Sequence, residues 1–115
     1  MKEQENIIVT LSFEFALEVI KYCEELESLR KFVLGNQLLK SGTSIGANIR
    51  EAQNAESKAD FIHKFKIVAK ELEETKYWLA LCSQSENYPS TKNLDNKIEH
   101  IERIVNKIII TTKGK

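Results

Sequence analysis

The stretch LLKSGTSIGANIREAQNA, residues 38–55, combines two patterns that favour different structures. Its glycines and hydroxyl side chains are typical of turns. Its apolar residues Leu38, Ile45, Ile49 and Ala52 nevertheless recur at helical spacing through the same residues. The repeat predicts a helix that carries a row of small side chains, and such a row lets a neighbouring helix approach closely.

The small-residue face of this helix is predicted to be a packing groove. Glycine inside a helix costs about 0.5–1 kcal/mol relative to alanine, so tertiary packing has to offset that cost. The predicted groove residues are Gly42, Gly46, Ser41, Ile45 and Asn48. We expect the next helix to cover them with Phe61, Phe65 and Trp78. Two alternatives are a kink near residues 41–44 and a phosphate-binding loop, although SGTSIG lacks the Walker lysine–serine order and follows no strand.

Three further segments carry a helical apolar repeat. The first holds two apolar stripes, of which the second contains Phe13, Ala16, Ile20 and Cys23, and this indicates two neighbours or one neighbour and an oligomer partner. The third segment begins at Ser57, a suitable N-cap residue. The predicted helices cover residues 7–29, 32–55, 57–85 and 91–111. Short connections between four amphipathic helices predict one all-α domain over residues 1–115, an antiparallel up-down-up-down four-helix bundle.

The overall composition narrows the class of protein. The chain has 115 residues, of which 42% are hydrophobic and 30% charged, and this is typical of one soluble globular domain. No apolar run reaches the roughly 18 residues that span a bilayer, and the first residues are too acidic for a signal peptide. We therefore expect a cytoplasmic protein. Cys23 and Cys82 fall on apolar stripes and are predicted to be reduced core residues.

Opposite charges balance in number but are segregated along the chain. Residues 1–29 contain seven acidic and two basic residues, whereas residues 30–50 contain four basic and no acidic ones. Solvated faces that complement neighbouring helices are the simpler interpretation. A functional interpretation is a strip that contacts nucleic-acid phosphates. Its candidate residues are Arg50, His63, Lys66 and Lys70, because the last three share one helical face.

Polar residues on the second and third predicted helices are candidates for a network inside the bundle or at a subunit contact. They are Asn48, Glu51, Glu71 and Thr75. We interpret them as fixing the helix register rather than as catalytic. Metal sites in bundles use Glu-x-x-His motifs, and neither His63 nor His100 has a glutamate three residues before it. No catalytic residue, metal ion or cofactor is therefore predicted.

Residues 41–81 resemble a known family signature. The sequence SGTSIGANIREAQNAESKADFIHKFKIVAKELEETKYWLAL resembles the signature region of a bacterial four-helix-bundle family, whose members were first noticed as open reading frames inside intervening sequences of large-subunit ribosomal RNA genes. The matching elements are GTSIGANI, the following EA pair, SKADF and KELEETKYWL. Leu72 departs from the pattern, since a smaller residue is expected there. The flanking helices match by pattern only.

The resemblance implies a bundle that assembles as a ring, a homopentamer. The chain is also similar to the accessory variability protein of diversity-generating retroelements, a pentameric barrel that binds nucleic acid and a reverse transcriptase. The family has no established enzymatic activity that could be carried over. We therefore expect a non-enzymatic, ring-forming adaptor that contacts RNA or a nucleic-acid-processing protein. The alternative is an interaction scaffold that binds only proteins.

Overall fold

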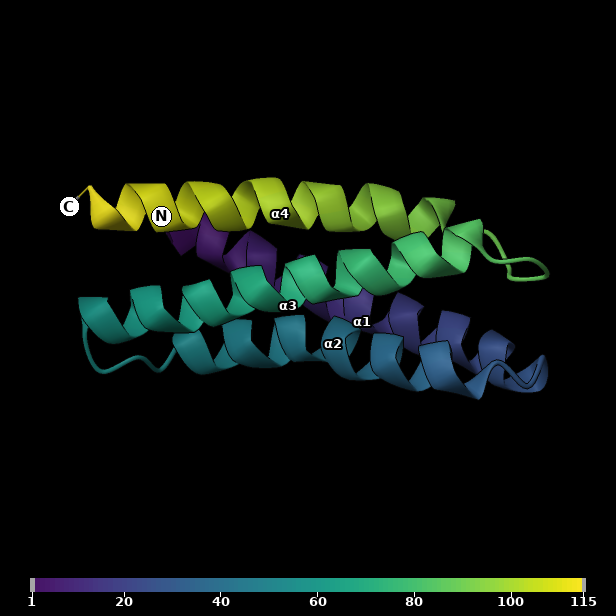
Figure 1. The fold of residues 1–115 in the computed structure, drawn as a ribbon. Helices are drawn as coiled ribbons and strands as arrows, with labels where there is room; N and C mark the ends of the chain where they lie inside the picture. Colours follow the sequence, from purple (N-terminus) through teal and green to yellow (C-terminus); the bar gives the residue numbers. More distant parts are fainter. Residues whose placement is uncertain (1, 115) are drawn as a thin grey trace.

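The computed structural model describes residues 2–114, with side chains described for residues 7–114. It contains four α-helices (Figure 1): α1 (Lys2–Ser28), α2 (Phe32–Ala52), α3 (Lys58–Gln84) and α4 (Lys92–Lys113). Within residues 2–114, sequential helices pack against each other and α1 packs against α4, whereas the Cα atoms of the two diagonal pairs stay more than 8 Å apart. The fold is therefore the predicted all-α, antiparallel up-down-up-down four-helix bundle.

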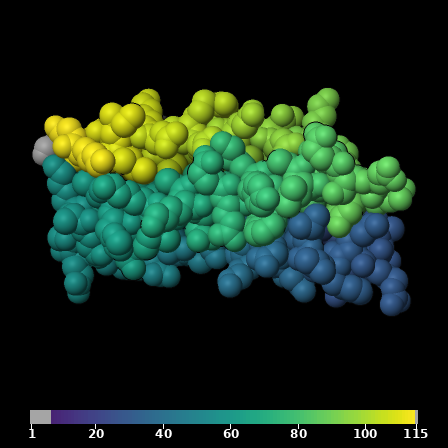
Figure 2. Space-filling model, in the orientation of Figure 1, coloured from purple at the N-terminus to yellow at the C-terminus, as the bar shows by residue number. Residues whose placement is uncertain are grey.

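The bundle is a rod whose Cα atoms extend over 47 × 21 × 19 Å. Both chain ends and the α2–α3 connection lie at one end of the rod, whereas the α1–α2 and α3–α4 connections lie at the other (Figure 1). The N-terminal half of α3 and the C-terminal half of α4 therefore lie at the same end, and Figure 2 shows them side by side on one face.

The core is one cluster of apolar side chains to which all four helices contribute. Its largest fully buried members include Phe15, Leu38, Ile45, Phe65, Leu72, Ile98 and Ile108. Cys23 and Cys82 are buried and free, in agreement with their prediction as reduced core residues. Burial raises the pKa of the Cys23 thiol to about 11 and raises that of Cys82, so both remain protonated at neutral pH.

The ends of the helices follow local capping chemistry. The Ser57 hydroxyl accepts a hydrogen bond of 3.0 Å from the Asp60 amide, which confirms Ser57 as the N-cap of α3. After α1, Arg30 adopts a left-handed φ of 62°, and the Lys31 amide donates to the Leu26 carbonyl at 2.8 Å. This pattern commonly terminates helices, and it turns the chain into α2.

Two helix ends differ from the predicted ones by three residues or more. α1 begins at Lys2 rather than residue 7, because residues 2–6 are mostly good helix formers that carry no apolar repeat. α2 ends at Ala52 rather than residue 55, because the amides of residues 53–55 bond to carbonyls three residues back and the chain tightens into a turn.

α2 runs without a break through its glycines, so a break that splits the segment near residues 41–44 and a phosphate loop there are both wrong. A Cβ atom on Gly42 would lie 2.9 Å from Val19 Cγ1, and one on Gly46 would lie 3.2 Å from the Ser12 carbonyl oxygen. Both neighbours belong to α1.

The prediction that α3 covers these glycines is therefore wrong. A bundle gives α2 two neighbours, and Gly42 and Gly46 lie on the α1 side. The aromatic side chains expected over them are placed elsewhere. Phe65 is buried in the central core, where it stacks on Phe61 with ring centroids 4.7 Å apart, and Trp78 packs at the edge of the core.

Candidate interaction surfaces

The outer seam between α1 and α2 is hollowed along its length. Two cavities of about 310 and 290 Å³ lie in it, one towards each end of α2. We call this surface the α1–α2 groove and define it by Phe13, Ala16 and Ile20 of α1 with Phe32, Leu39 and Ala47 of α2. Small side chains permit the close approach of the two helices, and the same small side chains leave the outer surface hollow.

Bulky apolar side chains at the α1–α2 groove are open to solvent. Phe13 is 50% exposed and Ile20 38%. Phe13, Ala16 and Ile20 belong to the second apolar stripe that the sequence indicates on α1. Within the described chain no helix covers the bulky side chains of these residues, whereas Cys23 of the same stripe is buried against α2. Exposed apolar side chains that gather in one place mark an interaction site.

Charged side chains border the two ends of the groove. The Arg50 guanidinium lies 5.4 Å from the centroid of the Phe13 ring, within cation–π distance. At the opposite end, Glu24 and Glu27 line the cavity together with Lys31. The groove is therefore apolar along its middle, with a cation at one end and mainly carboxylates at the other.

The predicted nucleic-acid-binding residues do not form one strip. His63, Lys66 and Lys70 are exposed on the outward face of α3, and among the described side chains none of them forms an ion pair. Arg50 lies at the α1–α2 groove instead, on the side of α2 that faces α1. Its inclusion in the strip is therefore wrong, because the helical repeat alone does not tell which neighbour an α2 residue faces.

The predicted network of Asn48, Glu51, Glu71 and Thr75 is not formed among the described residues. Asn48 donates to the Ser44 carbonyl of its own helix at 2.8 Å. The Nζ atom of Lys64 of α3 lies 3.2 Å from Oε1 of Glu51, and the two side chains form an ion pair. These two residues of α2 therefore make no hydrogen bond to either of the α3 residues. The network inside the bundle is thus wrong, whereas its alternative at a subunit contact stays a prediction.

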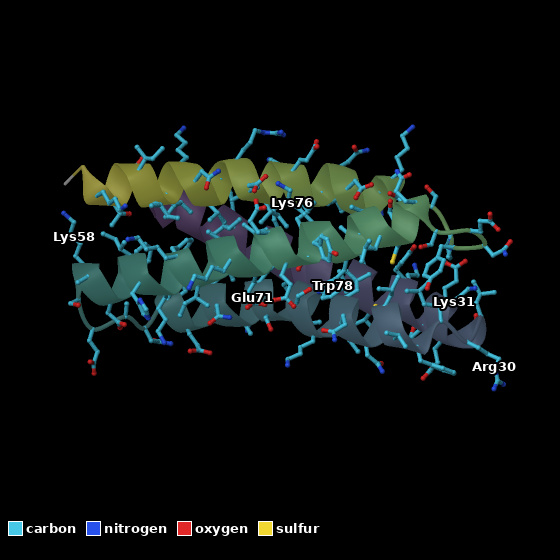
Figure 3. All side chains as sticks on the ribbon, viewed as in Figure 1. Arg30, Lys31, Lys58, Glu71, Lys76 and Trp78 are labelled. Atoms are coloured by element: carbon cyan, nitrogen blue, oxygen red, sulfur yellow. The ribbon has the colours of Figure 1, made fainter. Side chains whose placement is uncertain are left out.

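A smaller polar contact lies where that network was expected. The hydroxyls of Thr75 and Ser41 are 2.9 Å apart and join α3 to α2 inside the bundle, and Thr75 also lies 2.7 Å from the Glu71 carbonyl oxygen. Ser41, predicted as a groove residue, thus faces α3. Burial and then the charge of Glu74 raise the pKa of the Glu71 carboxyl, which lies between α3 and α2 (Figure 3).

Two ion pairs tie α4 to its neighbours. Lys76 of α3 lies 3.0 Å from Glu102, and this contact raises the pKa of the Lys76 ammonium. Lys97 lies 2.8 Å from Glu18 of α1, and its hydrogen bond lowers the pKa of the Glu18 carboxyl. Both pairs connect neighbouring helices, so we assign them to the packing of the bundle.

Metal-binding and membrane-spanning features are absent from the described part of the chain. Among the side chains of residues 7–114, no group of three or more His, Cys, Asp and Glu is arranged to hold a metal ion. None of the helices in that part of the chain combines the length and the apolar character needed to cross a bilayer.

Comparison with known proteins identifies the family. The sequence profile of the 23S rRNA-intervening sequence proteins matches residues 4–109. The chain belongs to this family. A solved structure from the S23 ribosomal protein family of Bacteroides thetaiotaomicron, described as a protein of unknown function, is 40% identical to this intervening sequence protein. The two superpose with a TM-score of 0.87 over 92% of this chain and 97% of that chain. A comparison with curated proteins gives no match.

The resemblance seen in residues 41–81 is thus confirmed, and the family match extends over residues 4–109. What the sequence prediction missed is the α2 half of the α1–α2 groove, namely Phe32, Leu39 and Ala47. A signal was present, since Phe32 and Leu39 are seven residues apart and lie on one face of a helix. The prediction for this helix used only its core-facing repeat, which contains neither residue.

Proposed function

We propose that this chain is a cytoplasmic, non-enzymatic adaptor that self-associates into a ring, a homopentamer, and contacts RNA or a nucleic-acid-processing protein. The observation that carries the proposal is the uncovered α1–α2 groove. Its α2 residues extend from Phe32 to Arg50. At 1.5 Å per residue this corresponds to about 27 Å, which is most of the length of α2. Burying such apolar surface is the main favourable term in protein association.

A ring requires two different surfaces on each subunit, whereas a twofold dimer requires one. A second surface is available on α3, which lies diagonally opposite α1 in the bundle. Tyr77 is 58% exposed there, and its ring packs edge-on against Trp78 with centroids 5.2 Å apart. Aromatic side chains of this kind are enriched in interfaces. We therefore propose that the α1–α2 groove of one subunit receives the Tyr77 face of the next.

Contact with RNA is supported by the cations of α3. His63, Lys66 and Lys70 are exposed and have no carboxylate partner among the described side chains. Phosphate neutralisation by such side chains gives binding that weakens steeply with salt. Salt-dependent binding of the purified protein to RNA is the expected result. If no RNA binds at low salt, the function is that of a scaffold for proteins alone.

Light scattering tests the assembly. We expect a particle of about five times the 13.2 kDa chain mass at micromolar concentration. Phe13→Glu places a charge on an exposed apolar position that lines the groove, so it should shift the particle towards monomer while leaving the helix content unchanged. Val33→Glu is the matched control, because Val33 is 79% exposed and does not line the groove. A monomeric wild-type protein would contradict the proposal.

Mixing two variants tests the ring geometry. Phe13→Glu damages the groove and Tyr77→Glu damages the opposite surface, so each variant alone should be monomeric. A mixture still has one intact groove and one intact Tyr77 face. It should therefore form a one-to-one heterodimer. If the mixture stays monomeric while each single variant is folded, the two surfaces are not partners.

A further inference from the structure

The C-terminal part of α3 differs in charge from the rest of the helix. Residues 58–76 contain five lysines and four acidic residues, whereas residues 77–84 contain no charged residue. Within this last part Tyr77 is 58% exposed, and Ala80, one turn further on, is exposed as well. We call residues 77–84 the uncharged segment of α3. The cores of protein interfaces are depleted of charged residues and enriched in aromatic ones, so this segment has a composition typical of an interface.

A contact inside the bundle fixes the height of Tyr77 along the rod. The hydroxyls of Ser41 and Thr75 are 2.9 Å apart, so these residues of α2 and α3 are level with each other. The two helices run in opposite directions (Figure 1), and each rises 1.5 Å per residue. Tyr77, two residues after Thr75, is therefore level with Leu39, two residues before Ser41.

The α2 residues at this height line one of the two cavities of the α1–α2 groove. By the same count, residues 32–39 are level with the uncharged segment of α3. The cavity has a volume of about 310 Å³, and its apolar lining includes Phe32 and Leu39 of α2 with Ile20 of α1. Phe32 is 47% exposed and Leu39 37%, so this lining is open to solvent in the single chain. We call it the connection-end cavity, because it lies near the α1–α2 connection.

A ring of side-by-side rods brings surfaces of equal height together. The α1–α2 groove and α3 both run along the rod, so they meet along their length only where neighbouring rods lie side by side (Figure 1). Rotation about an axis that runs along the rods keeps all subunits parallel. The connection-end cavity of one subunit then meets the uncharged segment of the next. Antiparallel neighbours would bring the charged half of α3 to the apolar cavity, which costs the hydration of those charges.

We propose that Tyr77 of one subunit packs into the connection-end cavity of the next, between parallel rods. This inference rests on the ring in the proposed function and assigns it a direction and a register. Tyr77 supplies a large apolar ring for the cavity, and the small side chain of Ala80 lets the two helices approach. The cavity is incomplete without the neighbour, since within the described chain no helix covers its exposed lining.

Disulfide crosslinking tests the register. Counted from Ser41 and Thr75, Ala80 is level with Asn36, and both residues are exposed. The double variant Ala80→Cys, Asn36→Cys should form disulfide-linked multimers under mild oxidation, up to the full ring, on non-reducing electrophoresis. The matched control is Ala80→Cys, Ala47→Cys. Ala47 is exposed at the other cavity, about 16 Å from Asn36 along α2, and should form no crosslink.

Tyr77 itself is tested by dilution followed by light scattering. Tyr77→Ala should raise the concentration at which the ring dissociates by at least about 10-fold, because aromatic anchors carry much of the binding energy of an interface. Tyr77→Phe keeps the ring system and should leave that concentration nearly unchanged. Circular dichroism establishes that each variant is folded.

The outcomes separate this inference from the ring itself. The single variant Ala80→Cys should form no crosslink, because the native Cys23 and Cys82 are buried. Crosslinks through Ala47→Cys, or through neither pair, overturn the register while leaving the ring in place. A Tyr77→Ala protein that assembles as well as the wild type does the same. A monomeric wild-type protein overturns both.

Discussion

α2 is joined to α1 and to α3 by two different kinds of contact. On the α1 side the two helices approach closely because Gly42 and Gly46 of α2 have no side chain. A Cβ on Gly42 would lie 2.9 Å from Val19 Cγ1, and one on Gly46 would lie 3.2 Å from a backbone oxygen of Ser12. The α1 seam is therefore controlled by steric fit.

The α3 side of α2 depends instead on polar side chains that reach across. The Ser41 and Thr75 hydroxyls are 2.9 Å apart, and Lys64 lies 3.2 Å from Glu51. Such bonds contribute modest free energies each, and water or a neighbouring group can replace them in part. We therefore expect substitutions at the α1 seam to lower the free energy of unfolding strongly and substitutions at the α3 seam to lower it little.

The largest effect is expected from Gly46→Leu. The nearest atoms to its new side chain belong to the α1 backbone, which cannot move aside without separating the helices. We expect the free energy of unfolding to fall by about 3 kcal/mol or more, at the upper end of overpacking costs. Urea denaturation followed by circular dichroism measures the loss. Gln37→Leu, at an exposed α2 position that does not line the groove, should change it by less than about 0.5 kcal/mol.

Gly42→Ala should be the next largest effect, with a sign opposite to that of Gly35→Ala. The new Cβ at Gly42 meets the stiff, branched Val19 side chain at 2.9 Å, so we expect a loss of about 1–2 kcal/mol. At Gly35 the new Cβ lies 3.6 Å from Leu26, an ordinary contact. Removing a helical glycine should then increase the free energy of unfolding by about 0.5–1 kcal/mol. The same denaturation experiment measures both.

A double-mutant cycle makes the Gly42 result specific. Val19→Ala removes the methyl groups that the new Cβ would meet, so Gly42→Ala should cost less in that background than in the wild type. If Gly42→Ala and Gly35→Ala stabilise the protein equally, Gly42 does not pack closely against Val19.

The sequence predicts the helices and the core well because both depend on a local repeat. The apolar spacing around Leu38 and Ile45 identifies an α2 helix despite its glycines, and the buried side chains of the bundle come from these repeats. The same repeat places Gly42 and Gly46 on one face. It does not say which of two neighbouring helices meets that face, since this depends on the direction in which successive helices turn around the bundle.

The candidate site was predicted less well for the same reason. His63, Lys66 and Lys70 share a face of one helix, and the structure leaves all three exposed. Arg50 lies on another helix, where only the assembled bundle determines which side it occupies. The predicted strip therefore included one residue that belongs to the α1–α2 groove.

Ser41→Ala tests the polar seam and should have a smaller effect than the glycine variants. It removes the hydroxyl next to Thr75, which keeps the Glu71 carbonyl as a partner. We expect a loss of about 0.5–1.5 kcal/mol by denaturation. Adding Thr75→Val removes the other partner and should cost little more, because no buried polar group is then left unpaired. A loss as large as that of Gly46→Leu would mean that the two seams do not differ.

The smallest effect concerns the charge of Glu71, on the α2–α3 seam near Lys40. Burial and then Glu74 raise its pKa, so the folded protein binds this proton more tightly than the unfolded chain does. The protonated carboxyl therefore stabilises the folded state at low pH. This contribution is lost as the pH rises from the ordinary carboxyl pKa, about 4.3, through the raised pKa. Glu71→Gln should raise the melting temperature slightly at pH 7 and leave it unchanged at pH 4.

Glu18→Gln is the control of opposite sign. The hydrogen bond from Lys97 lowers the pKa of Glu18, so the ionised carboxyl stabilises the folded state above the ordinary carboxyl range and this contribution is lost as the pH falls. The variant should therefore melt at a lower temperature than the wild type at pH 7, with the difference shrinking as the pH falls. If Glu71→Gln instead lowers the melting temperature at pH 7, the ionised Glu71 carboxylate supports the α3 seam rather than weakening it.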